Sequence, residues 1–178
     1  SVSVRFAYDK NGNNVRTLVP GGGEILREYD AADRLVPERH VEKRSGIDNT
    51  TRFAYDKAGN LACITDNGGS KTRIRYDLMN REILRREKDG GAIRQIFDRN
   101  GQLIRSIRPK EYARAGEEGA GEQYTYDAKG NVRSVIGADG VLKEQRIYDR
   151  ENRLLASLDG AGSGVEYAYD FGGRRTRV

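Results

Sequence analysis

The stretch Tyr55-Asp56-Lys57-Ala58-Gly59-Asn60-Leu61 decides the fold of this chain, because its pattern returns along the whole sequence, for example as Tyr148-Asp149-Arg150-Glu151-Asn152-Arg153-Leu154. An aromatic residue followed by aspartate occurs in this setting at Tyr8-Asp9, Tyr29-Asp30, Tyr55-Asp56, Tyr76-Asp77, Phe97-Asp98, Tyr126-Asp127, Tyr148-Asp149 and Tyr169-Asp170. Successive aromatic positions differ by 21, 26, 21, 21, 29, 22 and 21 residues. A period near 21 with two insertions is typical of a repeat protein.

The residue four places after each aromatic, here called the αL position, is always Gly, Asn or Asp. The eight residues are Gly12, Asp33, Gly59, Asn80, Gly101, Gly130, Asn152 and Gly173. Glycine reaches positive φ because it lacks Cβ, and Asn and Asp are the other residues that enter this region at modest cost. The pattern therefore predicts a positive φ at this position in every repeat.

The residues on either side of this turn alternate as they do in β-strands. Phe53 and Tyr55 share one face before the turn, and Leu61 and Thr65 belong to a second run with period two after it. We therefore expect each repeat to be a strand, a tight turn and a strand. The aspartate carboxylate is expected to accept backbone N–H groups inside the turn.

The residue directly after the αL position, here called the donor position, always carries a side-chain hydrogen-bond donor. The residues are Asn13, Arg34, Asn60, Arg81, Gln102, Asn131, Arg153 and Arg174. Two interpretations are open: these side chains brace a neighbouring turn or carbonyl, or they are exposed and keep the protein soluble.

Further turn signals mark the connection from one repeat to the next. They are Gly21-Gly22-Gly23, Asn67-Gly68-Gly69, Asp89-Gly90-Gly91, Asp139-Gly140 and Asp159-Gly160. Two strands per repeat give roughly sixteen antiparallel strands, which at ~4.8 Å spacing would form a sheet on the order of 75 Å wide. Because such wide twisted sheets curl, split or close, we expect an all-β fold with a curved sheet, as a wall, a spiral or a barrel segment.

The composition fits a sheet with a solvated face. Only 36% of the 178 residues are hydrophobic, and the mean hydropathy is −0.81. Thirty-two basic and 27 acidic residues give a formal net charge of +5, and they are interspersed along the strands. We therefore expect no nucleic-acid surface, which would gather its cations beside exposed aromatics. No apolar run approaches the ~18 residues of a membrane span.

We interpret residues 1–178 as a single repeat array with insertions at about 37–51 and 109–123. Lys110 to Ala115 in the second insertion is expected to form a short helical turn, followed by a flexible stretch from Gly116 to Gly121. Because the sequence begins at Ser1 without a methionine or a signal peptide, we expect an interior fragment of a longer chain.

Residues that could carry catalysis or bind metal are few. His40 is the single histidine and has no nucleophile signature beside it, and the lone Cys63 is interpreted as a buried thiol. Asp9 to Asn13 begins like a calcium loop, but Asn14 and Pro20 stand where that loop needs Gly and Glu. We expect no catalytic, cofactor-binding or metal-binding residue. The repeated aromatic, Asp and αL residues, with Arg34, Arg81, Arg153 and Arg174, are candidates for a structural role.

The unit Tyr-Asp-x-x-Gly-Arg/Asn-Leu/Val resembles the YD repeat of the RHS family from Phe6 to Arg175. The family includes bacterial Rhs polymorphic toxins, the C component of Tc toxin complexes and the teneurins. The resemblance implies a β-ribbon that spirals into a hollow shell, a cocoon that in bacterial members encloses a C-terminal toxin domain. The implied partners are the rest of the parent shell, its toxin and a secretion-system or Tc component, and the implied localisation is secreted or extracellular. The family's self-cleaving segment and a toxin domain are not recognised here.

Three functional hypotheses follow. The first is a non-catalytic shell segment that confines a toxin for delivery. The alternative is a surface-exposed binding module, in which Arg-rich strands or the insertions recognise glycans or a protein receptor. The third is an enzyme such as a basic nuclease, which would have to use His40.

Overall fold

A computed structural model describes residues 3–178 as an all-β protein with two short helical segments. Strands β1 to β15 follow one another in chain order in one antiparallel sheet, and β16 and β17 form a two-stranded sheet. The chain divides into two compact units, residues 1–90 and residues 91–178. The expected all-β fold of antiparallel hairpins is confirmed, and the 17 strands in the described residues agree with the sixteen or so predicted.

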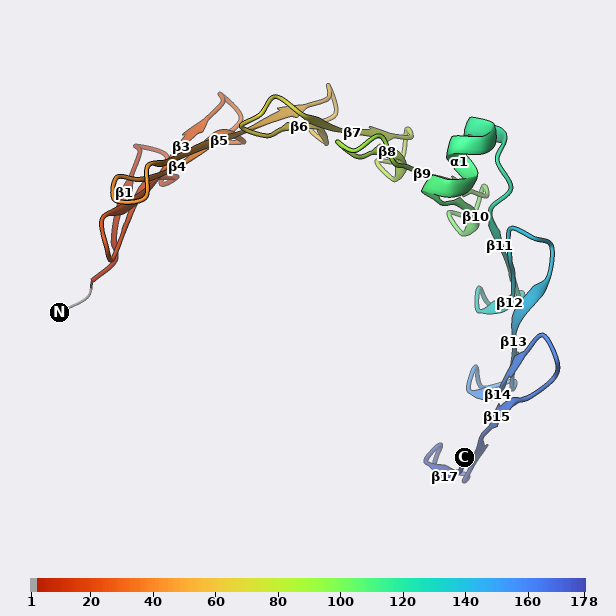
Figure 1. Ribbon diagram of the computed structural model, residues 1–178. Helices are drawn as coiled ribbons and strands as arrows, with labels where there is room; N and C mark the ends of the chain where they lie inside the picture. Colours follow the sequence, from red (N-terminus) through yellow and green to blue (C-terminus); the bar gives the residue numbers. More distant parts are fainter. Residues whose placement is uncertain (1–2) are drawn as a thin grey trace. The chain divides into compact units, whose positions relative to one another are not determined.

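The first unit consists of successive hairpins (Figure 1). Its strands are β1 (Arg5–Tyr8), β2 (Asn14–Val19), β3 (Gly23–Tyr29), β4 (Leu35–Glu42), β5 (Ile47–Tyr55), β6 (Leu61–Thr65), β7 (Lys71–Tyr76) and β8 (Glu82–Arg86). The strands β1, β3, β5 and β7 each end at the aromatic residue of a repeat. The predicted order of strand, turn and strand is therefore found in each repeat of this unit.

The second unit continues the same order. Its strands are β9 (Ala92–Phe97), β10 (Leu103–Ile107), β11 (Glu122–Tyr126), β12 (Val132–Ile136), β13 (Leu142–Tyr148), β14 (Leu154–Asp159), β15 (Gly164–Glu166), β16 (Ala168–Tyr169) and β17 (Arg175–Arg177). Helix α1 (Pro109–Ala115) and the 3-10 segment η1 (Gly116–Glu118) lie between β10 and β11. Within residues 3–178, no helix has the length and apolar character needed to cross a membrane.

Each aromatic-Asp turn closes in the same way. In the repeat of Tyr55, the Gly59 N–H donates to the Asp56 carbonyl at 3.1 Å, and the Asp56 N–H donates to the Asn60 carbonyl at 2.9 Å. The predicted positive φ is confirmed at all eight αL positions, with values from 57° at Asp33 to 92° at Gly59. The register shifts beside the aromatic, as between Ala54 and Tyr55. This is a tight hairpin whose αL residue forms a bulge.

The turns that lead from one repeat to the next use related geometry. Asp66 accepts the backbone N–H groups of Gly68 and Ser70 at 3.0 Å, and Gly69 has a φ of 83°. The turn predicted at Asp159-Gly160 is also found, but its positive φ lies at Gly162. Asp and Gly at this spacing therefore stabilise the turns at both ends of the strands.

The two insertions are accommodated differently. Residues 37–51 lie in β4, in β5 and in the turn between them. In the second insertion, α1 confirms the predicted helical turn, but the expectation of a flexible Gly116–Gly121 stretch is wrong. A Cβ on Gly121 would lie 2.6 Å from the Ser106 carbonyl oxygen, so this glycine allows close packing.

The apolar core is small. The buried hydrophobic residues in the described part of the chain are Ile74, Leu84, Ala92, Ile107 and Ala156. The substantial contacts between elements join sheet neighbours, apart from those that α1 makes with β9 and η1. Ile107 lies beneath the glycines of the second insertion and is 0% exposed. Stability therefore depends strongly on interactions between adjacent strands and turns.

The turn geometry predicts different outcomes for two substitutions at Gly101, whose φ is 88°. Gly101→Val should lower the free energy of unfolding by roughly 1–3 kcal/mol, because a β-branched residue is strained at positive φ. Gly101→Asn should be tolerated better, since Asn80 and Asn152 occupy the same position with φ of 60° and 72°. Urea unfolding of both variants checks this, and equal midpoints would contradict the turn assignment.

Candidate functional site: a ladder of repeated turns

The aspartate of each repeat organises its turn through one carboxylate oxygen. In the first repeat, Asp9 Oδ1 accepts the backbone N–H groups of Asn11 and Asn13, both at 2.9 Å. Asp56 Oδ1 does the same with Ala58 and Asn60 at 2.9 Å. The predicted acceptance of turn N–H groups is therefore confirmed. It satisfies backbone donors that the hairpin ladder leaves without a carbonyl partner.

The second carboxylate oxygen usually holds the side chain at the donor position. Arg34 Nε donates to Asp30 Oδ2 at 2.8 Å, and Asn60 Nδ2 donates to Asp56 Oδ2 at 3.1 Å. Arg81 and Arg153 bind Asp77 and Asp149 in the same way. The aspartate thereby fixes the direction in which the donor side chain leaves the turn.

These bonds favour the charged carboxylates. Hydrogen bonding to the Asn60 backbone N–H lowers the pKa of Asp56, and the same bond from Arg81 lowers the pKa of Asp77. The Arg34 side chain is the main cause of the lowered pKa of Asp30. Because these three shifts have the same cause, hydrogen bonds within the turn, they do not mark one pair of carboxylates for acid–base chemistry.

A second set of bonds joins five of the repeats to the one before it. The Tyr55 hydroxyl donates to the Leu35 carbonyl at 2.9 Å, and the Tyr126 hydroxyl donates to the Leu103 carbonyl at 2.7 Å. The same bond runs from Tyr29 to Asn14, from Tyr76 to Leu61 and from Tyr169 to Leu154. The acceptor is always six residues after the aromatic of the preceding repeat. We call these bonds tyrosine rungs, and the sequence analysis did not predict them.

The donor position forms a third link between repeats. Asn13 Nδ2 donates to Asp33 Oδ1 at 2.7 Å, and Asn60 Nδ2 donates to Asn80 Oδ1 at 2.8 Å. The Arg34 guanidinium instead stacks over the Tyr55 ring at 4.6 Å, and that of Arg153 stacks over Tyr169 at 4.9 Å. The bracing interpretation of this position is therefore confirmed in these repeats.

The residues considered for catalysis do not assemble into a reactive site. His40 Nε2 lies 2.7 Å from Glu38 Oε1, and its side chain is half exposed. The Cys63 thiol, interpreted from the sequence as buried, is half-buried in the structure. In residues 3–178, no three His, Cys, Asp or Glu side chains are placed to hold a metal ion.

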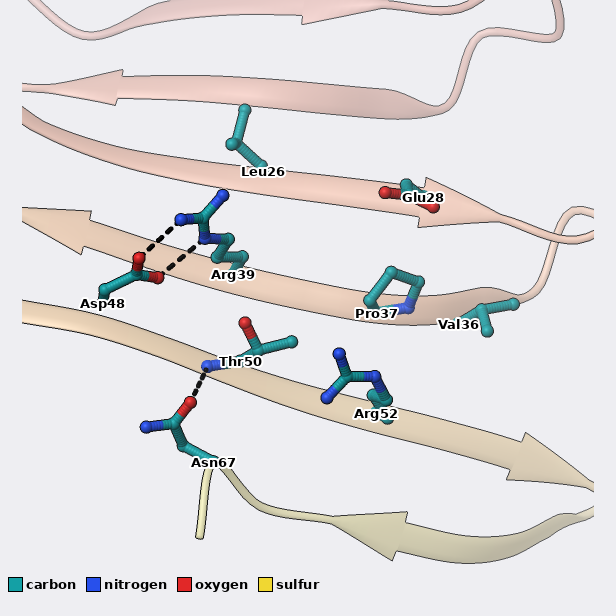
Figure 2. A pocket seen from close by; sticks show the side chains of 9 residues that line it. All are labelled: Leu26, Glu28, Val36, Pro37, Arg39, Asp48, Thr50, Arg52 and Asn67. Atoms are coloured by element: carbon teal, nitrogen blue, oxygen red, sulfur yellow. Dashed lines mark hydrogen bonds and ion pairs between the residues drawn. The ribbon is translucent and has the colours of Figure 1, made fainter. Parts of the chain in front are cut away.

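A shallow depression of about 690 Å³ lies over β3, β4 and β5 in the first unit (Figure 2). Its lining includes Arg39, which forms an ion pair with Asp48, and Thr50, whose N–H donates to Asn67 Oδ1 at 3.1 Å. Arg52 and Glu28 also line it and have no ion pair within residues 3–178. The depression offers charged contacts around the apolar Leu26 and Pro37, which suits binding better than chemistry.

The repeated turns and rungs match a known architecture. A family model described as the teneurin YD-shell matches residues 2–178. The chain belongs to this YD-shell family. The resemblance to RHS and YD-repeat proteins inferred from the sequence is therefore confirmed. Comparison with curated proteins gave no match.

Solved structures show the same YD-shell fold. The TcdB2-TccC3-Cdc42 crystal structure aligns with a TM-score of 0.75 at 16% identity, covering 97% of this chain and 10% of that one. TcdB2-TccC3 without its hypervariable C-terminal region gives 0.73 at 15% identity, with the same coverage. A Photorhabdus luminescens Tc holotoxin pore gives 0.52 at 14% identity, covering 97% and 11%. This YD-shell chain therefore spans about a tenth of the length of the chains it matches.

The tyrosine rungs predict a measurable effect of one hydroxyl. Tyr126→Phe should lower the free energy of unfolding by about 1 kcal/mol, because the Leu103 carbonyl loses its donor. Tyr8→Phe is the matched control, since the Tyr8 ring is 60% exposed and its hydroxyl has no hydrogen bond within residues 3–178. Urea unfolding checks both variants, and equal losses would show that the rung is not the cause.

The turn carboxylates predict acid sensitivity. The folded-state pKa values of Asp30, Asp56 and Asp77 lie below the ordinary 3.8, so the stabilisation from these carboxylates is fully present above the unfolded pKa and is lost as the pH falls through the folded pKa. The melting temperature should therefore be constant above about pH 5 and fall between about pH 4 and pH 2.

Asp56→Asn tests the origin of this acid sensitivity. The amide oxygen can still accept the turn N–H groups but does not titrate in this range, so the decline towards low pH should become shallower. Glu28→Gln is the control, because it removes an exposed carboxylate that has no hydrogen bond within residues 3–178. If both variants flatten the decline equally, the turn carboxylates are not its source.

Proposed function

We propose that this chain is a non-catalytic wall segment of an RHS-type shell that encloses a C-terminal toxin domain of the same parent protein. Membership of the YD-shell family over residues 2–178 supports the assignment to a shell. Similarity of fold to the TcdB2-TccC3 structures over 97% of the chain supports a shell of the toxin-enclosing type.

The observation that carries the proposal is the link between successive turns. Most successive repeats in the described residues are tied together by a tyrosine rung or by the donor side chain, as from Arg34 to Tyr55 and from Asn131 to Asn152. Such links need neighbouring repeats and no large core, so the sheet can be extended repeat by repeat. A sheet of this kind suits a wall that separates two spaces.

The chemistry of the strands fits confinement of a polypeptide. Positively and negatively charged residues are interspersed along the strands and form ion pairs, such as Arg27–Glu38 at 2.7 Å and Arg146–Glu144 at 2.7 Å. A wall with large apolar patches would bind an unfolded chain irreversibly, whereas a mixed polar surface would not. We infer that the segment performs no reaction and that delivery places the parent protein outside the producing cell.

The test uses the full-length parent protein. Electron microscopy should show a hollow particle with this segment in its wall, and limited proteolysis should leave the enclosed domain intact. A matched pair of variants locates the wall: Asn60→Ala removes a link between turns and should increase cleavage of the enclosed domain, whereas Lys57→Ala changes an exposed turn residue of the same repeat and should not. A solid particle, or a toxin domain cleaved as fast as an unprotected chain, would refute the proposal.

A binding module is the second candidate, and the depression over β3 to β5 favours it. Arg52 and Glu28 are charged side chains on its lining without an ion pair in residues 3–178, which leaves both open to a ligand. A glycan array and a receptor pull-down with the wild type and with Arg52→Ala test this function. Specific retention that is lost in Arg52→Ala would support it, and weak retention that is removed by salt would not.

A further inference from the structure

The donor position of each repeat and the αL position of the next repeat carry matched residues. Where the donor is Asn, the next αL residue is Asp or Asn, and the pairs are Asn13 with Asp33, Asn60 with Asn80 and Asn131 with Asn152. Where the donor is Arg or Gln, the next αL residue is Gly, and the pairs are Arg34 with Gly59, Arg81 with Gly101, Gln102 with Gly130 and Arg153 with Gly173. All seven pairs within the chain obey this turn-matching rule.

The Asn pairs are joined by a side-chain hydrogen bond between two turns. Asn60 Nδ2 donates to Asn80 Oδ1 at 2.8 Å, and the same nitrogen donates to Asp56 Oδ2 of its own turn at 3.1 Å. The other Asn donors make the same bond to the next turn, Asn13 to Asp33 and Asn131 to Asn152. An Asn amide is short, so it reaches the next turn through an oxygen that the αL side chain provides. Glycine at that position would leave the amide without this acceptor.

The longer donors lie across the αL residue itself. A Cβ on Gly59 would lie 3.8 Å from Arg34 Nη1, and a Cβ on Gly130 would lie 3.2 Å from Gln102 Nε2. An Asn or Asp side chain at these positions would compete with the donor for the same space. Glycine leaves that space to the donor, and the Arg34 guanidinium continues to the Tyr55 ring of the same repeat.

The order of the two kinds of pair along the chain separates consecutive repeats from more distant ones. Skipping one repeat would bring a donor to the αL residue two repeats further on. Five of the six possible skips are mismatched, namely Asn13 to Gly59, Arg34 to Asn80, Asn60 to Gly101, Gln102 to Asn152 and Asn131 to Gly173. The sixth skip, from Arg81 to Gly130, obeys the rule.

An array of similar hairpins needs such a distinction when it folds. Every repeat ends its first strand with an aromatic residue and an Asp turn, so the backbone edges of different repeats offer nearly the same hydrogen bonds. Pairing with the wrong repeat is a characteristic way in which repeat proteins misfold. Discrimination therefore has to come from side chains that differ between repeats, and the donor and αL residues differ in this way.

We propose that each donor residue and the αL residue of the next repeat act as one recognition pair, which selects the consecutive repeat as neighbour against the repeat beyond it. Specificity of this kind is a difference between two free energies. The correct neighbour provides an acceptor for Asn or room for Arg and Gln, whereas the wrong neighbour leaves an amide unpaired or crowds the longer side chain. Because the selection acts during folding, it is independent of what the finished wall encloses.

A double-mutant cycle at Asn60 and Asn80 in the 178-residue protein tests the recognition pair. Asn60→Arg places a long donor before Asn, and Asn80→Gly removes the acceptor of an Asn donor, so each single variant is mismatched. The double variant restores a match of the kind found at Arg34 and Gly59. Its unfolding equilibrium constant in urea should be about two- to tenfold lower than the two single changes predict by addition, the range expected for one hydrogen-bonded contact.

A matched control uses the same two substitutions in repeats that are not neighbours. Asn60→Arg combined with Asn152→Gly should give effects that add. The reverse exchange, Arg34→Asn with Gly59→Asn, provides an independent cycle if a single variant of the first cycle does not fold. Additive effects in both test cycles, or equal coupling in the control, would overturn the recognition pair.

Refolding tests the selection of neighbours separately from stability. The Asn60→Arg/Asn80→Gly double variant makes two skips matched, from Arg34 to position 80 and from position 60 to Gly101. Its native yield after dilution from urea, measured as the protease-resistant fraction, should therefore fall below that of the wild type although its own pair is matched. Gln102→Arg is the control, because it keeps every match and mismatch, and its yield should equal that of the wild type. A double variant that refolds as completely as the wild type, or an equal loss in Gln102→Arg, would overturn the selection of neighbours.

Discussion

The structure depends on one local constraint, the tight turn in which an aspartate carboxylate accepts two backbone N–H groups while the αL residue adopts a positive φ. This geometry closes the hairpin and also fixes where the next side chain points. In the repeat of Asp30, one carboxylate oxygen binds the turn and the other holds Arg34, whose guanidinium then reaches the ring of Tyr55. The turn therefore connects the conformation of one repeat to the packing of the next.

A sheet with few buried residues needs stabilisation from such connections. Only a handful of apolar side chains in the described part of the chain, Ile107 among them, are removed from water. The tyrosine rungs and the donor side chains supply bonds between neighbouring repeats, beside the aromatic-Asp turns. Because these bonds join nearest neighbours, the array resembles a solenoid in its energetics although its strands form antiparallel sheets. Because each repeat depends only on its neighbours, one repeated sequence motif can form arrays of different lengths.

The sequence predicted the local geometry well, because a positive φ restricts the residue type directly. The turns at Gly12, Asp33 and the other αL positions, the strands around them and the helix after Arg108 follow from single-residue preferences. The tyrosine rungs did not follow, since they depend on the register between repeats. The match between the donor residue and the αL residue of the next repeat, as of Asn13 with Asp33 and of Arg34 with Gly59, is present in the sequence, but it is recognised only when positions from adjacent repeats are compared. Glycines of the second insertion were misjudged because close packing and flexibility favour the same residue.

The position of Ile107 has a consequence for how the protein would come apart. The free energy of local opening depends on how many contacts a segment makes with its surroundings. Around Ile107, α1 and the close-packed glycines cover the sheet and add contacts that the other repeats within residues 3–178 do not have. Local opening should therefore be rare there, so that amide protons of β9 and β10 would exchange slowly with solvent deuterium.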